Sequence, residues 1–195
     1  MSTYLISGIA GFIGSSLARA PLEQGGQVRG IDNFSTGKPE NISDIQDQID
    51  FREADLLELE ATKLACRDVD YVLHQAAIPS VPRSIDNPLE TNRSSVDATV
   101  NLLVAARDAK VRRVVYAASS SAYGDTPPLP KTEDMAPNPI SPYAVGKLAG
   151  GHYMTSFWRC YGLETVCLRY FNVFGPRQDP YSPYSGVLGS SSRKC

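Results

Sequence analysis

The sequence predicts an α/β fold, a doubly wound parallel sheet with helices on both of its faces. Short apolar runs typical of strands alternate with segments whose apolar residues recur every three or four positions, as on one face of a helix. Strands and helices that alternate at this pitch require parallel strands joined by right-handed crossovers. No internal repeat is visible, and the loops are short enough for one domain.

Each element is bounded by a change in pattern. In the first helix, Phe12 and Leu17 are spaced for one buried face, and Gly25 and Gly26 end it. Pro21 within that helix costs about 3 kcal/mol or more unless the helix kinks or ends there. A long loop rich in proline precedes the last helix. Strands are expected at 3–7, 28–31, 49–54, 70–75, 111–119 and 164–170, and helices at 12–24, 56–65, 88–110 and 143–161.

Composition excludes several classes of protein. Lys and Arg total 19 against 21 Asp and Glu, so no strongly basic face is expected, and we do not expect nucleic-acid binding. No apolar run is long enough to span a bilayer, and the N-terminus lacks the features of a signal peptide. The four cysteines form no CxxC pair, which favours free thiols in the cytoplasm. With only two histidines and no clustered cysteines, we expect no metal site.

The turn after the first strand is typical of a dinucleotide site. Gly8, Gly11 and Gly14 have the spacing GxxGxxG and lie between a strand and a helix. Glycines let the backbone turn tightly and approach a pyrophosphate, which the N–H groups of the helix N-terminus can bind. Asp32 ends the second strand, where its carboxylate would bind the adenosine ribose and repel the extra phosphate of NADP. The expected cofactor is therefore NAD.

A second group of residues has a pattern typical of proton transfer. Tyr143 and Lys147 are four residues apart and share one helical face. A nearby ammonium and a bound nicotinamide ring would both favour the phenolate, which makes the Tyr a usable base. Ser119 ends the fifth strand, where its hydroxyl could share the substrate's proton. His74 is better explained as a core or strand-end histidine, because the tyrosine already supplies a base.

These motifs resemble the extended short-chain dehydrogenase/reductase family, and within it the branch of NAD-dependent nucleotide-sugar epimerases such as UDP-glucose and UDP-N-acetylglucosamine 4-epimerases. The resemblance runs from residue 3 to about residue 188. It implies a Rossmann-type NAD-binding domain over residues 1–176 and an irregular tail over 177–195 that starts a substrate-binding region. It also implies a UDP-sugar substrate and, for full-length members, a homodimer. The segments that carry it are ISGIAGFIG (6–14), GIDNFSTGK (30–38), HQAA (74–77), ASSSAYG (118–124), SPYAVGK (141–147) and RYFNVFGPR (169–177).

The resemblance also implies a role for each matching position. The catalytic residues would be Ser119, Tyr143 and Lys147. The cofactor-binding residues would be Gly8, Gly11, Phe12, Ile13, Gly14, Asp32, Asn33, Ser35, Thr36, Gly37, Asp55, Leu56, Gln75, Ala76, Ala77, Ser95, Tyr143, Lys147, Tyr170 and Phe171. The substrate-binding residues would be Ser119, Ser120, Ser121, Tyr143, Asn172 and Arg177, and Arg83 and Arg93 are further candidates for substrate phosphates.

The implied reaction is 4-epimerisation of a UDP-hexose, N-acetylated or not, through a 4-keto intermediate. Ser120 and Ser121 stand where related 4,6-dehydratases carry an Asp-Glu pair, so elimination of water has no obvious catalyst. The absence of a glutamate near Ser121 also disfavours the related decarboxylases, though less strongly. A catalytically silent NAD-binding fragment is the alternative from another class.

Several positions depart from the family pattern. Ser95 replaces a usual Asn, Gly146 a usual Ser and Gly151 a usual Glu. Family members continue beyond residue 188 with a seventh strand and a smaller domain, which residues 189–195 do not resemble. We therefore expect a truncated chain in which Val166 and Leu168 lose part of their cover. Alone, residues 1–195 should be loosely folded or prone to aggregation, bind NAD weakly and lack epimerase activity.

Overall fold

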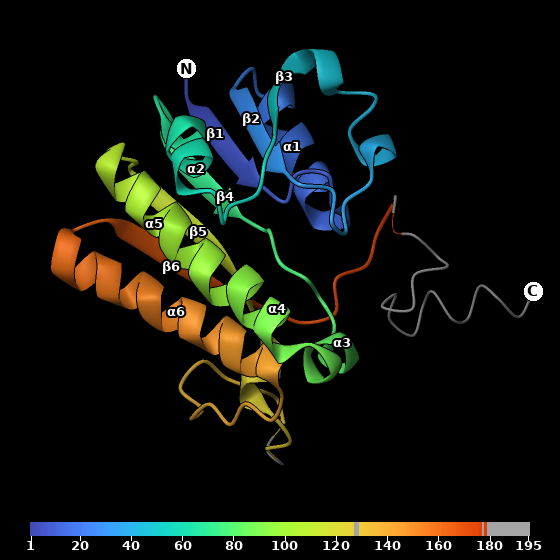
Figure 1. Ribbon diagram of the computed structural model, residues 1–195, viewed down its shortest axis with the longest axis vertical. Helices are drawn as coiled ribbons and strands as arrows, with labels where there is room; N and C mark the ends of the chain where they lie inside the picture. The colour runs from blue at the N-terminus through green and yellow to red at the C-terminus, as the bar shows by residue number, and fades with distance from the viewer. Residues whose placement is uncertain (127–128, 177, 179–195) are drawn as a thin grey trace, which may run out of the picture.

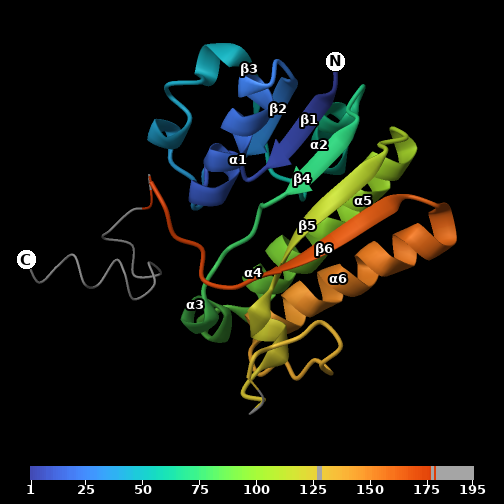
Figure 2. The same ribbon diagram turned by 180° about the vertical axis from the view of Figure 1, so that it is seen from behind.

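The computed structural model describes residues 1–126, 129–176 and 178, and the expected tail at 177–195 lies outside these residues except for Gln178. All six expected strands are present. They are parallel and follow the order β3-β2-β1-β4-β5-β6, with helices on both faces of the sheet, as Figures 1 and 2 show. The strands are β1 (Thr3–Ser7), β2 (Gln27–Asp32), β3 (Ile49–Glu53), β4 (Tyr71–His74), β5 (Arg113–Ser119) and β6 (Glu164–Tyr170).

The helices follow the prediction except in the middle of the chain. They are α1 (Phe12–Glu23), α2 (Leu59–Cys66), α3 (Val81–Asp86), α4 (Pro88–Asn92), α5 (Ala98–Asp108) and α6 (Pro142–Tyr161), with 3₁₀ turns η1 (Pro39–Asn41), η2 (Gln46–Gln48) and η4 (Ser120–Tyr123). The helix expected over 88–110 is present as a continuous helical run over 88–108, but a π-helical turn, η3 (Arg93–Asp97), lies within it between α4 and α5. Hydroxyls in this stretch bind carbonyls of the preceding turn, Ser94 to Thr91 and Thr99 to Ser95, and such bonds compete with the regular helical ladder.

The two faces of the sheet bury different side chains, because successive residues of a strand point to opposite faces. Helices α2, α5 and α6 cover one face, on which Leu5, Val72 and Val114 are fully buried (Figure 1). Helix α1 covers the other, where Ile6 and Ala18 are fully buried (Figure 2).

Pro21 lies in the last turn of α1, so the helix ends soon after it, as expected. The Pro21 carbonyl accepts hydrogen bonds from the N–H groups of Gln24 (3.2 Å) and Gly26 (2.8 Å). Gly25 has a φ of 74°, the left-handed conformation that commonly closes a helix. The proline therefore lies where few helical hydrogen bonds remain to be formed, because α1 ends at Glu23.

Strand β6 forms one edge of the sheet in the described residues. Val166 is 37% exposed and Leu168 42% exposed, so apolar side chains of this strand are partly open to solvent in the described structure. Among the described helices, none is both long enough and apolar enough to cross a membrane.

Two adjacent glycines in α6 have different surroundings. A Cβ on Gly150 would lie 2.4 Å from the Tyr116 hydroxyl oxygen, so the close packing of α6 on β5 requires a glycine there. A Cβ on Gly151 would meet only the Cys167 sulfur, at 3.9 Å.

We expect Gly150→Ala to destabilise the fold by about 1–3 kcal/mol through overpacking against Tyr116. The matched variant Gly151→Ala should stabilise it by roughly 0.5–1 kcal/mol, because alanine is the better helix former. Urea unfolding of both variants and the wild type measures the two changes. Equal effects of the two substitutions would contradict this account of the α6–β5 contact.

Candidate functional site

A cavity of about 1060 Å³ opens at the carboxyl ends of the strands, where the strand order reverses between β1 and β4. Open parallel sheets bind their ligands at such a point. Most of the predicted site residues line this cavity. They are Gly8, Gly11, Phe12, Ile13, Gly14, Asp32, Asn33, Ser35, Thr36, Asp55, Leu56, Gln75, Ala76, Ala77, Ser119, Tyr143, Lys147, Tyr170, Phe171 and Asn172.

Four of the predicted residues that the structure describes are not on the cavity wall. Ser120 and Ser121 lie in the turn η4 behind Ser119, and Gly37 packs against Ala10. Ser95 is buried in the π turn, and Arg177 falls outside the described residues.

Two of the departures from the family pattern contact each other. A Cβ on Gly146 would lie 2.9 Å from the Cβ of Ser95, so the glycine lets η3 approach α6 closely. Ser95 therefore supports the packing behind the cavity and does not form its wall. The sequence does not indicate this, because the pairing depends on the position of the π turn.

The glycine turn forms a tight backbone cradle. Gly8 has a φ of 71°, and a Cβ there would lie 2.7 Å from the Ala76 nitrogen. A Cβ on Gly14 would lie 2.1 Å from the Gly8 carbonyl oxygen. Gly11 precedes α1 and has no side chain to occupy the first N–H groups of the helix, which line the cavity at Phe12 and Ile13. This arrangement suits an anion.

Asp32 ties the glycine turn to the loop after β2. Its carboxylate oxygens accept hydrogen bonds from the N–H groups of Ala10 (2.8 Å) and Phe34 (2.9 Å). Burial raises the pKa of this carboxyl, and the backbone hydrogen bonds partly offset the rise. Each oxygen has a further lone pair that a ligand hydroxyl can use. Asp32 thus shapes the site in addition to the ribose contact expected of it.

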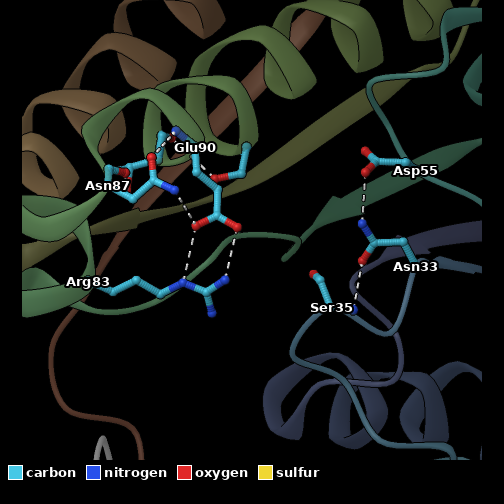
Figure 3. A network of polar contacts seen from close by, with 8 residues as sticks. Asn33, Ser35, Asp55, Arg83, Asn87 and Glu90 are labelled. Atoms are coloured by element: carbon cyan, nitrogen blue, oxygen red, sulfur yellow. Dashed lines mark hydrogen bonds and ion pairs between the residues drawn. The ribbon is translucent and has the colours of Figure 1, made fainter.

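Polar pairs stand on two facing walls, as Figure 3 shows. On one wall, Asn33 donates to Asp55 at 2.8 Å and links the ends of β2 and β3. On the other, Arg83 donates to both carboxylate oxygens of Glu90, at 3.3 and 2.9 Å, and Asn87 also donates to that carboxylate. Arg83, a candidate for substrate phosphates, is therefore already paired in the described structure.

Most of this second wall was not predicted from the sequence. Asn87 and Glu90 line the cavity because α3 and α4 bring them there, and neither of these short helices was predicted as a separate element. A signal for α3 was present: Ser80 caps it, accepting from the Arg83 N–H at 3.0 Å, and Pro82 stands in its first turn.

The first turns of α6 carry the candidate proton-transfer residues. Ser141 caps the helix by accepting from the Ala144 N–H at 3.2 Å, and Pro142 begins it. Tyr143 follows directly and faces the cavity with Ser119. Burial raises the pKa of the Tyr143 phenol, and a hydrogen bond with Ser119 lowers it in part. Burial thus has the larger effect on this phenol, and the lowering that a bound nicotinamide would add stays a prediction.

Lys147 is an ammonium inside the protein core. It is 4% exposed, donates a hydrogen bond to the Ala117 carbonyl at 2.9 Å, and lies 5.0 Å from the centre of the Tyr116 ring. Burial lowers its pKa to about 8, so the ammonium form still predominates at neutral pH. A buried charge held in this way is typical of a functional site.

Gln75 offers polar groups that lack partners. Both atoms of its side-chain amide are buried, and neither has a hydrogen-bond partner in the part of the chain that is described. Since Gln75 also lines the cavity, a ligand with polar groups can satisfy this amide.

We expect Lys147→Met to raise the free energy of unfolding at pH 7 by up to roughly 3 kcal/mol, since it removes a buried charge. The folded pKa of about 8 lies below the usual 10.5, so the penalty is complete below pH 8 and is relieved as the pH rises to 10.5. The difference in the free energy of unfolding between variant and wild type should therefore fall toward zero over that range. Urea unfolding over this pH range tests the prediction, with Lys63→Met at a partly exposed position as control, and a difference that does not depend on pH would contradict it.

Comparison with known proteins places the chain in a family. The NAD dependent epimerase/dehydratase family matches residues 4–195. A UDP-glucose 4-epimerase of Mycolicibacterium smegmatis is 41% identical over 188 residues, which are 94% of this chain and 60% of the relative. The structure of a UDP-N-acetylglucosamine 4-epimerase from Methanobrevibacter ruminantium is 39% identical, with a TM-score of 0.91 over 96% of this chain and 60% of that one. A Thermus thermophilus UDP-glucose 4-epimerase solved with NAD is 37% identical, with a TM-score of 0.87 over 98% of this chain and 60% of that one. The chain spans about 60% of the length of these relatives, and it belongs to the NAD dependent epimerase/dehydratase family.

Proposed function

We propose that this chain binds NAD and forms the cofactor-binding and catalytic part of a UDP-hexose 4-epimerase. The observation that carries this proposal is a single cavity. It joins the glycine turn at Gly8 to the side chains of Ser119, Tyr143 and Lys147. The similarity to UDP-sugar 4-epimerases supports the same assignment.

The residues at one end of the cavity fit NAD. The uncapped N-terminus of α1 suits the diphosphate, and the free lone pairs of Asp32 suit the hydroxyls of the adenosine ribose. The buried amide of Gln75 would find partners on the dinucleotide. When bound, NAD supplies the group that accepts a hydride from the sugar and returns it.

The hydrogen bonds of Ser119 set the direction of proton transfer. Its oxygen accepts from the N–H of Ser121 (3.1 Å) and from the Ser121 hydroxyl (2.8 Å). Ser119 Oγ is the acceptor in both bonds, so its own proton remains available for a hydrogen bond to Tyr143. A hydrogen bond with Ser119 lowers the pKa of the Tyr143 phenol, which agrees with this direction. Ser119 would thus stabilise the phenolate of Tyr143 as it takes the C4 hydroxyl proton, with the Lys147 ammonium adding positive charge nearby.

The same turn favours epimerisation over elimination. Ser121 is engaged with Ser119, and neither Ser120 nor Ser121 provides a carboxylate to move a proton on the sugar carbon next to the ketone. A 4-keto sugar would therefore rotate within the site and take back the hydride on its opposite face. Neither serine would promote loss of water.

The proposal extends to the oligomeric state and to the cellular compartment. We propose a homodimer, because α6 leaves Val145, Trp158 and Tyr161 more than half exposed. Light scattering on the purified protein tests the dimer.

Free thiols at Cys66, Cys160 and Cys167 fit a cytoplasmic protein.

The test of the function separates cofactor binding from turnover. NAD binding is measured by fluorescence on residues 1–195. Interconversion of UDP-glucose and UDP-galactose, and of their N-acetylated forms, is measured on residues 1–195 and on a fusion with the portion of the Mycolicibacterium relative that this chain does not match. NAD binding without turnover in the fusion would favour the silent NAD-binding alternative, and a 4-keto-6-deoxy product would indicate a dehydratase.

NAD should bind more tightly than NADP, because the Asp32 carboxylate would repel the extra phosphate. Asp32→Ala should weaken the preference and also weaken NAD binding itself, since the variant frees the N–H groups of Ala10 and Phe34. Fluorescence titration with both dinucleotides measures the two effects. Equal affinities of the wild type for NAD and NADP would exclude the role given to Asp32.

Tyr143→Phe should abolish turnover in the fusion, a loss of at least about a hundredfold, because it removes the base. NAD affinity should change little, since the ring remains. Parallel measurements of NAD affinity and epimerase rate make the comparison. A variant that keeps near-wild-type activity would show that another group takes the proton.

A further inference from the structure

The two strands that meet at the reversal of strand order are joined by buried side chains. Ser7 and His74 are paired across β1 and β4 at their carboxyl ends. Ser7 is 0% and His74 1% exposed, and Ser7 Oγ lies 2.7 Å from His74 Nδ1. On the other side of the ring, His74 Nε2 lies 3.0 Å from Thr99 Oγ1 of α5. Neither histidine nitrogen takes part in the proposed chemistry.

The direction of each hydrogen bond follows from one carbonyl. Thr99 Oγ1 lies 2.7 Å from the carbonyl oxygen of Ser95, which can only accept, so the hydroxyl proton of Thr99 is used there. Thr99 must then accept from His74, which places the imidazole proton on Nε2. His74 Nδ1 is left as an acceptor, and Ser7 donates to it.

The neutral form of His74 is held by its surroundings. Burial lowers the pKa of His74 to about 3, and the Lys147 ammonium of α6 acts in the same direction. The Tyr116 ring of β5 lies 5.4 Å from the imidazole, and Ser7 and Thr99 contact its two nitrogens. His74 therefore stays neutral throughout the neutral pH range, and each hydrogen bond of the chain keeps the same donor and acceptor.

The chain of bonds ends on the cavity wall. Ser7 Oγ accepts from the N–H of Ala76 at 3.3 Å, and the Ser7 carbonyl accepts from the N–H of Gln75 at 3.1 Å. Ala76 also packs against the backbone of Gly8, where no Cβ would fit. The segment after β4 is thus held against the glycine turn from two directions.

We propose that Thr99, His74 and Ser7 are positioning residues, which act through a directed chain of hydrogen bonds to fix Ala76 and thereby set the affinity of the cavity for NAD. The part of this inference that concerns NAD affinity rests on the proposed function. Thr99 does not line the cavity, although its neighbour Ala98 does, so its hydroxyl affects binding only through the residues that it contacts, and the exchange of the Ala76 amide tests the route through His74 and Ser7.

The test compares two substitutions at Thr99 in residues 1–195. Thr99→Val keeps the shape but leaves the His74 Nε2–H without its acceptor, and Thr99→Ser keeps the hydroxyl. We expect NAD to bind about tenfold more weakly to Thr99→Val and within about twofold of wild type to Thr99→Ser. AMP, which would contact mainly the Asp32 end of the cavity, should bind all three about equally. Wild-type NAD affinity in Thr99→Val, or no rescue in Thr99→Ser, would overturn the proposal.

Two measurements by NMR do not depend on a cofactor. Amide hydrogen exchange at Ala76 should be faster in Thr99→Val than in Thr99→Ser, and ¹⁵N shifts of the wild type should show His74 protonated on Nε2 alone. If the wild type fails to bind NAD, the proposed function fails, and the exchange at Ala76 still decides the hydrogen-bond chain. If Thr99→Val does not fold, the tautomer decides it, and a proton on Nδ1 would overturn the proposal.

Discussion

Gly8 carries the constraint on which the rest of the site depends. A Cβ at this position would lie 2.7 Å from the Ala76 nitrogen and 2.8 Å from its Cα, so only a glycine lets the turn after β1 meet the segment after β4. Its φ of 71° is also one that other residues rarely adopt. This contact closes the floor of the cavity at the reversal of strand order, and it brings the cradle of α1 beside the residues that follow β5 and begin α6.

Behind that floor, burial acts on three titratable side chains at once. It lowers the pKa values of His74 and Lys147 and raises that of Tyr116, so each group is moved toward its neutral form. His74 and Tyr116 are neutral at pH 7, whereas Lys147, with a pKa of about 8, stays charged. The Ala117 carbonyl and the Tyr116 ring offset part of that cost, so a buried cation is held near Ser119 and Tyr143 at one end of the cavity.

The fold was predictable because its signals are local and repeated. Alternating apolar patterns placed all six strands, and Ser141, Pro142 and Gly162 mark the ends of α6 within the sequence itself. Parallel strands then gather their carboxyl ends at one edge, which is why residues as far apart as Gly8 and Tyr143 could be expected in one site. The family resemblance supplied most of the residues expected to contact the cofactor, and the cavity is lined by most of them.

The remaining features depend on contacts that no local pattern encodes. Ser95 lies behind the cavity wall because it falls in the π turn, and the Asn87–Glu90 pair forms part of the wall because α3 and α4 bring it there. The phenol of Tyr143 has a raised pKa because its burial depends on the whole core, whereas the sequence showed only the lysine four residues away. The direction of the bonds through His74 follows from a carbonyl in that same π turn. Ser95 in the π turn therefore has two roles: its side chain packs behind one wall of the cavity, and its carbonyl orients the buried hydrogen bonds that hold Ala76.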